Sequence, residues 1–314
     1  MRAAVLTSPG AVPMCTDFPD PDPLPGREPL ELVAAGMHQV VRSVASGRHY
    51  GSTGEYPLVP GVDAVARRAD GGLVYTGNAR PPWGTMAERL VTPFDLPLPD
   101  GVDPVAIAAG MNPGMAGFIP LTRHLERRGE LGVVLILGAT GMAGRLAVQT
   151  ALALGATRVV AAGRDRPSLD ALQAAGAEAV SLADSAEPLT RAVRAATPGL
   201  VLDFVWGPVA EQAFAALARR GLDEDDADIS YVQIGALAGP DAAVPASLLR
   251  SRRITLSGSG AGSLSMTELF AQLPRLVALI SDGVLEVPYT TYPLSRVAEA
   301  WTHTGRTRAV VTPG

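Results

Sequence analysis

The sequence predicts an α/β protein that combines a β-rich domain with a doubly wound parallel-sheet domain of the Rossmann type. The first of three observations is a short apolar run, residues 133–137, which leads into a glycine-rich turn and then into apolar residues at helical spacing. The second is that strand-like and helix-like runs alternate from about residue 108 to residue 262, as in a parallel sheet covered by helices. The third is that residues 1–107 are rich in turns and short β-type runs, which favours a compact all-β domain.

The elements are expected in a definite order. The first 107 residues hold predicted strands at residues 2–6, 30–34, 72–76 and 88–91. The run 133–137 is the first parallel strand, Gly155 ends the helix that follows, and residues 158–162 form the next strand. Further alternating runs continue to residue 262, and residues 263–314 form a tail of helix and strand.

The glycine-rich turn, GATGMAG at residues 138–144, predicts a dinucleotide site. Gly141 and Gly144 hold the second and third glycine places of the G-x-G-x-x-G fingerprint, and Ala139 stands in the first. Such a turn lets backbone N–H groups and a helix N-terminus approach a pyrophosphate. The predicted contacts are Ala139, Thr140, Gly141, Met142 and Ala143. The alternative is a glycine-rich turn with no ligand.

The end of the second strand predicts which dinucleotide is bound. NAD-binding units carry an Asp or Glu about 20 residues past the glycines, where it binds the ribose 2′-OH. Here that place is Gly163, which is followed by Arg164. A glycine removes the anion that would repel a 2′-phosphate, and a guanidinium offers it charge-assisted bonds. The sequence therefore favours NADP(H) over NAD(H), with an arginine-rich surface turn as the alternative.

Composition excludes several classes of protein. The 314 residues carry a net charge of −5, with 47% hydrophobic and 18% charged residues, which is ordinary for a soluble protein and does not suggest nucleic-acid binding. All 26 basic residues are arginine, which excludes catalysis by lysine. The single cysteine excludes an intrachain disulfide and a four-cysteine zinc site. No uninterrupted apolar run approaches the roughly 20 residues of a membrane helix, and no signal peptide is recognised, so we expect no membrane association and a cytoplasmic location.

Along residues 1–314 the sequence resembles the zinc-independent, quinone-oxidoreductase-like branch of the medium-chain dehydrogenase/reductase superfamily. The motifs that carry the resemblance are MRAAVLTSPG at the start, ELVAAGMHQVV, PLVPGVDAVAR, YVQIGALAG and the C-terminal YPLSRVAEAWTHTGRTRAVVTP. The resemblance implies a GroES-like substrate-side domain made of residues 1–107 and 263–314, with a Rossmann NADP-binding domain at residues 108–262 between its two parts.

The resemblance also implies further cofactor contacts. They follow three apolar strand runs, at the carboxyl edge where ligands bind in open α/β sheets. For one of them, Trp206, the alternative is packing at the domain boundary. The contacts are Val205, Trp206, Gly235, Ala236, Leu237, Ser257, Gly258 and Ser259.

The sequence departs from the zinc-dependent alcohol dehydrogenases at their metal ligands. Met37 and His38 follow Gly36 where those enzymes carry a cysteine, and Val62 replaces the histidine of their G-H-E motif. No metal is therefore expected. The resemblance suggests Tyr50 as the catalytic residue, since its neutral hydroxyl would polarise a carbonyl or protonate a carbon. The alternative is a buried tyrosine with a satisfied hydroxyl.

Together these observations predict an NADPH-dependent oxidoreductase that transfers hydride to an activated double bond of a small quinone, enone or enoyl-type substrate without a metal. The alternatives are a ketone or imine reductase, or a non-catalytic NADPH-binding sensor or structural protein. The resemblance further implies a homodimer that pairs the edge strand at residues 253–257 across a two-fold axis. A monomer whose edge is covered by the acidic run 223–228 or by the C-terminal tail is the alternative.

Overall fold

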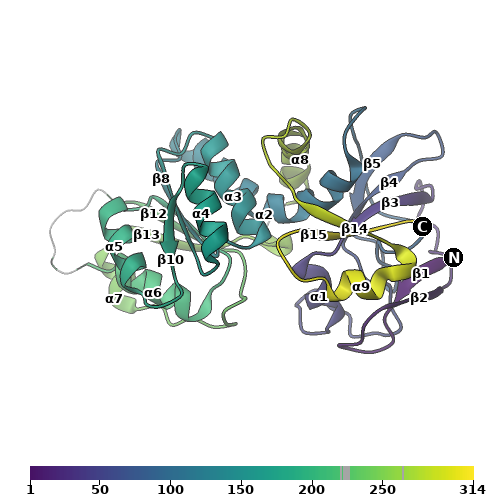
Figure 1. The fold of residues 1–314 in the computed structure, drawn as a ribbon, viewed down its shortest axis with the longest axis horizontal. Coiled ribbons are helices and arrows are strands. Elements are labelled where there is room, and N and C mark those ends of the chain that lie inside the picture. Colours follow the sequence, from purple (N-terminus) through teal and green to yellow (C-terminus); the bar gives the residue numbers. More distant parts are fainter. Residues whose placement is uncertain (220, 222–226, 264) are drawn as a thin grey trace. The chain divides into compact units, whose positions relative to one another are not determined.

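The structure is a computed structural model that describes residues 1–219, 221, 227–263 and 265–314 (Figure 1). It divides into two compact units. The terminal unit consists of Met1–Asn112 and Val277–Gly314, and the central unit consists of Pro113–Leu276. Both divisions fall inside long helices, α2 (Pro104–Arg128) and α8 (Met266–Ser281), rather than at the predicted boundaries after residues 107 and 262. The change of sequence pattern lies near the start of each helix, whereas the packing partners change part of the way along it.

The terminal unit is built on antiparallel sheet. Strands β1 (Arg2–Val5) and β2 (Met14–Asp17) form a separate hairpin-like pair. A seven-stranded sheet has the order β14-β15-β3-β4-β5-β7, with β6 also paired to β3, and only β14 and β15 run parallel to each other. The predicted strands correspond to β1, β3, β5 and β6. The remaining bounds are β3 (Leu30–Gly36), β4 (Asp63–Arg67), β5 (Leu73–Gly77), β6 (Arg89–Leu90), β7 (Asp95–Pro97), β14 (Tyr289–Pro293), β15 (Arg308–Thr312), α1 (Gln39–Ala45), η2 (Leu294–Arg296) and α9 (Val297–Thr302).

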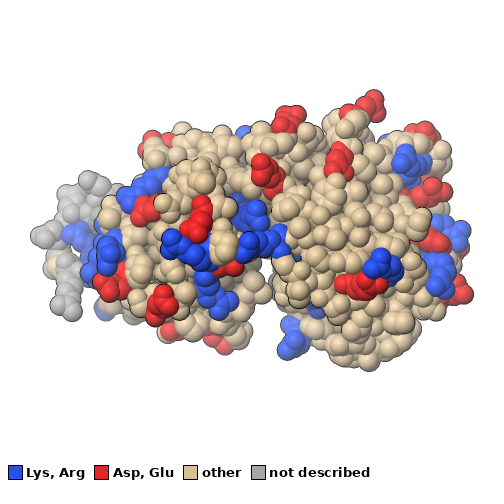
Figure 2. Space-filling view, in the orientation of Figure 1, with Lys and Arg blue, Asp and Glu red and all other residues tan. Residues whose placement is uncertain are grey.

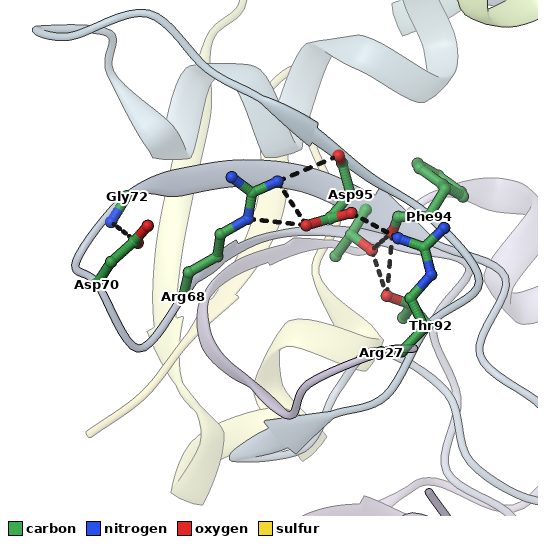
Figure 3. Close-up of polar contacts among 8 residues, drawn as sticks. Arg27, Arg68, Asp70, Gly72, Thr92, Phe94 and Asp95 are labelled. Atoms are coloured by element: carbon green, nitrogen blue, oxygen red, sulfur yellow. Dashed lines mark hydrogen bonds and ion pairs between the residues drawn. The ribbon is translucent and has the colours of Figure 1, made fainter. Parts of the chain in front are cut away.

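Side chains fix the short edge strand β7 in this sheet (Figure 3). The Asp95 carboxylate accepts a hydrogen bond from Arg27 Nη1 at 2.7 Å and another from Arg68 Nε at 2.7 Å. One residue earlier, the carbonyl oxygen of Phe94 accepts hydrogen bonds from the hydroxyls of Thr76 and Thr92. Because a strand of three residues forms few ladder bonds, these side-chain bonds are a substantial part of what holds it in the terminal unit.

The central unit is a parallel, doubly wound sheet, as predicted. Its six strands have the order β10-β9-β8-β11-β12-β13, and every neighbouring pair is parallel. The apolar run predicted at residues 133–137 is strand β8 in full. The bounds are β8 (Val133–Leu137), β9 (Arg158–Gly163), β10 (Glu178–Ser181), β11 (Leu200–Asp203), β12 (Ile229–Gln233), β13 (Ile254–Gly258), α3 (Met142–Ala153), α4 (Arg166–Ala174), α5 (Glu187–Ala196), α6 (Gly207–Leu217), α7 (Ala246–Ser251) and η1 (Ala261–Ser263).

Helices cover both faces of this sheet (Figure 1). One apolar cluster joins the sheet to α5, α6 and α7, and a second joins its other face to α2, α3 and α4. Strand residues therefore alternate between two cores: Leu135 and Leu137 pack in the first, and Val134 and Ile136 in the second. This burial on both faces explains why the strand reads as a continuous apolar run.

Helix α2 is, among the described residues, the one helix long and apolar enough to cross a membrane by length and composition. Of its most apolar window, 72% is buried within the protein. That degree of burial is typical of a core helix, so length and composition carry little weight for a membrane span here.

Charged side chains of both signs are scattered over the visible face of the molecule (Figure 2). Many of them form ion pairs at the surface, such as Arg158 with Glu178 and Arg191 with Glu187. This mixture agrees with the small net charge of −5.

Candidate cofactor site

The turn between β8 and α3 depends on two glycines that have no room for a side chain. Gly138 adopts a φ of +84°, and a Cβ there would lie 2.7 Å from Cγ1 of Val205. A Cβ on Gly144 would overlap the carbonyl oxygen of Gly138, so α3 packs directly against the turn. Gly138, which precedes the fingerprint, therefore makes the turn that the first fingerprint glycine usually makes. This explains why Ala139, completely buried, is accepted in that place.

The N-terminus of α3 is open. Its N-cap is Gly141, which is exposed, and no side chain accepts a hydrogen bond there. The first turn contains no acidic residue. Free backbone N–H groups and the helix dipole make such an end suitable for a phosphate. Thr140, Met142 and Ala143 are half-buried around it, so four of the five predicted contacts are accessible at this end of the helix, whereas Ala139 is buried beneath them.

The carboxyl end of β9 lies directly beside this turn. The backbone N–H groups of Gly138 and Ala139 both donate to the carbonyl oxygen of Ala162 at 2.9 Å. The next residue, Gly163, is buried, and Arg164 is exposed. Thus the position predicted to select the ribose is fixed against the glycine-rich turn by backbone hydrogen bonds.

The charged groups after β9 leave Arg164 available. The Asp165 carboxylate caps α4 by accepting a hydrogen bond from the backbone N–H of Ser168 at 3.0 Å. Arg166 pairs with Asp170 at 2.9 Å. Arg164 forms no ion pair with any residue that the structure describes. Its guanidinium is therefore free to bind an anion at the end of β9.

A buried carboxylate shapes the next loop, after β11. Asp203 is fully buried, and its Oδ1 accepts hydrogen bonds from the backbone N–H groups of Val205 at 2.9 Å and Trp206 at 2.8 Å. Its Oδ2 accepts a hydrogen bond from the hydroxyl of Tyr231 at 2.6 Å. Trp206 has φ +56° and ψ −156°, a strained conformation that costs of order 1–3 kcal/mol in a residue other than glycine. The carboxylate holds this strained turn in place.

Burial sets the protonation behaviour of that pair. Desolvation raises the pKa of Asp203, although the hydrogen bonds from Trp206, Tyr231 and Val205 oppose the rise. Burial and the nearby Asp203 charge raise the pKa of Tyr231 far above its ordinary value, so the phenol remains a donor. Neither residue is predicted from the sequence. The available signal was one acidic residue within the apolar run LVLDFVW.

The loops after β11 and β12 interlock through their backbones. The carbonyl oxygen of Asp203 accepts the N–H of Gly235 at 3.1 Å, and a Cβ on Gly235 would lie 2.5 Å from the carbonyl oxygen of Phe204. Further out, the N–H of Ala238 donates to the carbonyl oxygen of Val205 at 2.7 Å. This close contact fixes Gly235 and Ala236, while Leu237 remains 71% exposed.

The end of β13 is joined to the same edge. The N–H of Ser259 donates to the carbonyl oxygen of Gln233 at 2.8 Å. Trp206, Ser257 and Gly258 line one groove of 410 Å³, together with Tyr231, Gln233, Pro240 and Leu256. The central unit therefore brings together, along one sheet edge, the predicted contacts that follow β8, β9, β11, β12 and β13. The edge-to-face contact of Trp206 with Phe214 gives this residue a packing role as well.

Tyr50 lies in the terminal unit, in the turn region after α1. It is 76% exposed, and its ring stacks on that of His49 with centroids 4.1 Å apart. The alternative of a buried tyrosine with a satisfied hydroxyl is therefore wrong, and its catalytic role stays a prediction. In the same region the half-buried Tyr56 has a satisfied hydroxyl, which donates to the carbonyl oxygen of Ala45 at 2.7 Å.

His38 is buried in the same unit beside a carboxylate. Its Nε2 lies 3.2 Å from Oδ1 of Asp63, in a geometry that is not a hydrogen bond. The other oxygen, Oδ2, accepts a hydrogen bond from Tyr75 at 2.8 Å, and burial followed by the Asp63 charge raises the pKa of that tyrosine. His38 and Asp63 are only two potential metal ligands. Within the described ranges, no three His, Cys, Asp or Glu side chains gather to hold a metal ion.

Comparison with known proteins supports this architecture. No family model matches the chain. A probable NADPH-dependent quinone reductase of Emericella nidulans is 28% identical in an alignment that covers 100% of both proteins. The quinone oxidoreductase of Thermus thermophilus, solved also with NADPH, has a TM-score of 0.76 at 24% identity, covering 99% of this chain and 100% of that one. A mycobacterial quinone oxidoreductase has a TM-score of 0.80 at 21% identity, covering 100% of both.

The fold is that of these quinone oxidoreductases, with a GroES-like unit and a Rossmann unit, and the predicted fold class is confirmed. Along its whole length the chain is similar to a quinone reductase, which confirms the resemblance found in the sequence. The relative that matches along the whole chain is named as an NADPH-dependent reductase, the class of enzyme that the sequence predicts.

Proposed function

We propose that this protein is an NADPH-dependent oxidoreductase that reduces an activated double bond of a small quinone, enone or enoyl-type substrate without a metal. The oxidoreductase class and the use of NADP(H) are supported by the Emericella nidulans relative. Two neighbouring features of the structure support the proposal. The N-terminus of α3 is open, and Arg164, beside Gly163, forms no ion pair with the described residues. These two features suit a pyrophosphate and a 2′-phosphate respectively.

The residues of the central unit have distinct tasks in this proposal. The turn at residues 138–141 and the first N–H groups of α3 bind the pyrophosphate, and Arg164 binds the 2′-phosphate. The loops at residues 205–206 and 235–237 and the end of β13 at residues 257–259 orient the nicotinamide end, because they lie at the carboxyl ends of the neighbouring strands β11, β12 and β13. When bound, NADPH supplies a hydride.

The substrate class follows from the chemistry that remains without a metal. Conjugation in a quinone, enone or enoyl thioester delocalises the developing negative charge onto an oxygen, which neutral hydrogen-bond donors can stabilise. Tyr50 is the donor that we propose, with its hydroxyl polarising the carbonyl or protonating the adjacent carbon. Its 76% exposure leaves the hydroxyl accessible to a ligand.

An NADPH-oxidation assay tests the proposed function. Quinones, enones and enoyl thioesters are compared with simple ketones and imines, and turnover confined to the last two classes would replace the proposal with a ketone or imine reductase. Tight NADPH binding with no turnover in any class would indicate a sensor or structural protein. Tyr50→Phe should lower kcat by about 10²-fold or more if its hydroxyl protonates the product.

Arg164 provides a separate test of the cofactor assignment. Fluorescence titration of Arg164→Ala should show NADPH affinity reduced about tenfold or more, with little change for NADH, because only NADPH carries the phosphate that the guanidinium binds. Arg166→Ala is the matched control, since Arg166 already pairs with Asp170. Equal losses for both cofactors in Arg164→Ala would contradict the assignment.

We also propose that the protein is a homodimer that acts in the cytoplasm on small molecules and binds neither nucleic acid nor membrane. The dimer proposal is supported by β13, which is the edge strand of the central sheet, with Thr255 and Ser257 exposed. The acidic run invoked as an alternative cover, residues 223–228, lies largely outside the described residues. Light scattering should give twice the chain mass of 32.4 kDa. Leu256→Pro should yield a monomer. Alternate N–H groups of β13 face β12, as that of Ser259 does, so the N–H of Leu256 faces the open edge and proline removes it; a variant that stays dimeric would place the interface elsewhere.

A further inference from the structure

A lack of space for a side chain, not backbone conformation, requires glycine at position 163. Its φ is not positive, so the conformation suits any residue. A Cβ at this position, however, would overlap Cγ2 of Thr140 and would lie 2.8 Å from its Oγ1 and 3.1 Å from its Cβ. All three heavy atoms of the Thr140 side chain therefore occupy the space into which a side chain at position 163 would grow.

Rotation of Thr140 does not clear this space. Cβ of a threonine carries two heavy atoms, which share three staggered positions. Two of those positions face Gly163, as the contacts of Cγ2 and Oγ1 show. Any rotamer leaves at least one of them filled. The Cβ of a serine carries only one further heavy atom, Oγ, and one rotamer places Oγ away from Gly163.

The backbone does not clear it either. Residues 138 and 139 are bonded through their N–H groups to the carbonyl oxygen of Ala162, the residue before Gly163. The N–H of Leu182, which follows β10, donates to the carbonyl oxygen of Gly163 itself at 2.7 Å. The turn and the end of β9 are thus held at a fixed separation, and Thr140 projects between them.

We propose that Thr140 is a specificity-determining residue, which reserves position 163 for glycine and so keeps an acidic side chain out of the ribose site. The inference rests on the proposed NADPH-dependent function and deepens it. An acidic side chain at position 163 would bind the 2′-OH of NADH and repel the phosphate of NADPH. Cofactor preference then depends on residues 140 and 163 together, because an acidic side chain at position 163 can reach the ribose only when residue 140 is smaller than threonine.

The first experiment needs no cofactor. Gly163→Ala is introduced into three proteins: the unaltered protein, the Thr140→Val variant and the Thr140→Ser variant. In each case Tm is compared with that of the same protein carrying Gly163. With threonine or valine at position 140, both β-branched, the substitution should lower Tm by roughly 3–10 °C. With serine at position 140 the fall should be clearly smaller, because only the 3.1 Å contact with Cβ remains and a small shift relieves it. An equal fall in Tm with serine and threonine would overturn the proposal.

The second experiment measures cofactor binding by fluorescence titration. Gly163→Asp alone should weaken NADPH without improving NADH, because the new side chain is forced out of place. Gly163→Asp combined with Thr140→Ser should raise the ratio of NADH to NADPH affinity at least about tenfold above that of Gly163→Asp alone. A single variant that already prefers NADH as strongly as the double variant would refute the role of Thr140. If the unaltered protein binds neither cofactor, the proposed function fails, and with it the specificity role; the Tm series still decides separately whether Thr140 excludes a side chain.

Discussion

Replacing Tyr231 with phenylalanine should destabilise the central unit by an amount that depends on pH. The substitution keeps the ring, which packs against Phe214 at a centroid distance of 4.8 Å, and removes only the hydroxyl. That hydroxyl donates to the buried Asp203 carboxylate at 2.6 Å. A hydrogen bond to a charged, buried acceptor contributes roughly 2 kcal/mol. For a unit of this size, such a loss lowers Tm by about 4–8 °C.

The pH dependence follows from the raised pKa of Asp203. An acid whose folded pKa exceeds its unfolded value of 3.8 binds more protons when folded, so its contribution to stability falls as pH rises through this window. The Tyr231 bond opposes that rise in pKa. Its removal should therefore cost more on the alkaline side of the titration, tested at pH 8, than on the acidic side, tested at pH 4, because the ionised carboxylate accepts the stronger hydrogen bond.

Thermal unfolding followed by circular dichroism at the two pH values measures this difference. Tyr289→Phe is the matched control, because its hydroxyl also donates to a carboxylate, Asp103 at 2.7 Å, but at a solvent-exposed site. The control should lose less than about 1 kcal/mol at either pH. A Tyr231→Phe variant with an unchanged Tm, or with equal losses at both pH values, would show that the hydroxyl does not stabilise the ionised Asp203.

Three further outcomes are expected. Burial, with Arg127 and Arg128 nearby, lowers the pKa of His124 to about 4 in the folded protein, compared with 6.5 in the unfolded chain. The unfolded state therefore binds the proton first, and about 3 kcal/mol of stability should be lost as pH falls from 6.5 to 4. A His124→Gln variant that keeps this loss in urea titrations would contradict the assignment to His124. Asp95→Ala should lower stability by about 1–2 kcal/mol through loss of the bonds to Arg27 and Arg68, as judged by urea midpoint, whereas an unaltered midpoint would mean that β7 is held by its backbone alone. Exhaustive chelation should leave activity and Tm unchanged, and one tightly held zinc per chain in elemental analysis would overturn the metal-free proposal.

Sequence patterns predict the parallel sheet well because its strands are buried on both faces. Strand β8 was identifiable to the residue for this reason. The division into units was less accessible, since α2 and α8 each continue as helices from one unit into the other, although Pro113 and Pro274 lie at or near the two divisions. Periodicity records burial along an element, and it does not record which neighbours bury it.

The candidate site was predictable where function acts through the backbone and less so where it depends on contacts between distant residues. The glycine-rich turn and the glycine at position 163 are visible in the sequence. The bond between Asp203 and Tyr231 is not, because the two residues are brought together only by the pairing of β11 with β12. Likewise, the sequence shows that Gly163 lacks a carboxylate, but only the structure shows that Thr140 fills its space.

The position of Trp206 gives the central unit an optical reporter. The chain has three tryptophans, and the other two, Trp83 and Trp301, belong to the terminal unit. A variant with phenylalanine at those two positions would emit from the strained turn after β11 alone. Because reduced nicotinamide absorbs where tryptophan emits, quenching in that variant would report the arrival of the cofactor's nicotinamide end, while emission wavelength during unfolding would follow the central unit separately from the terminal one.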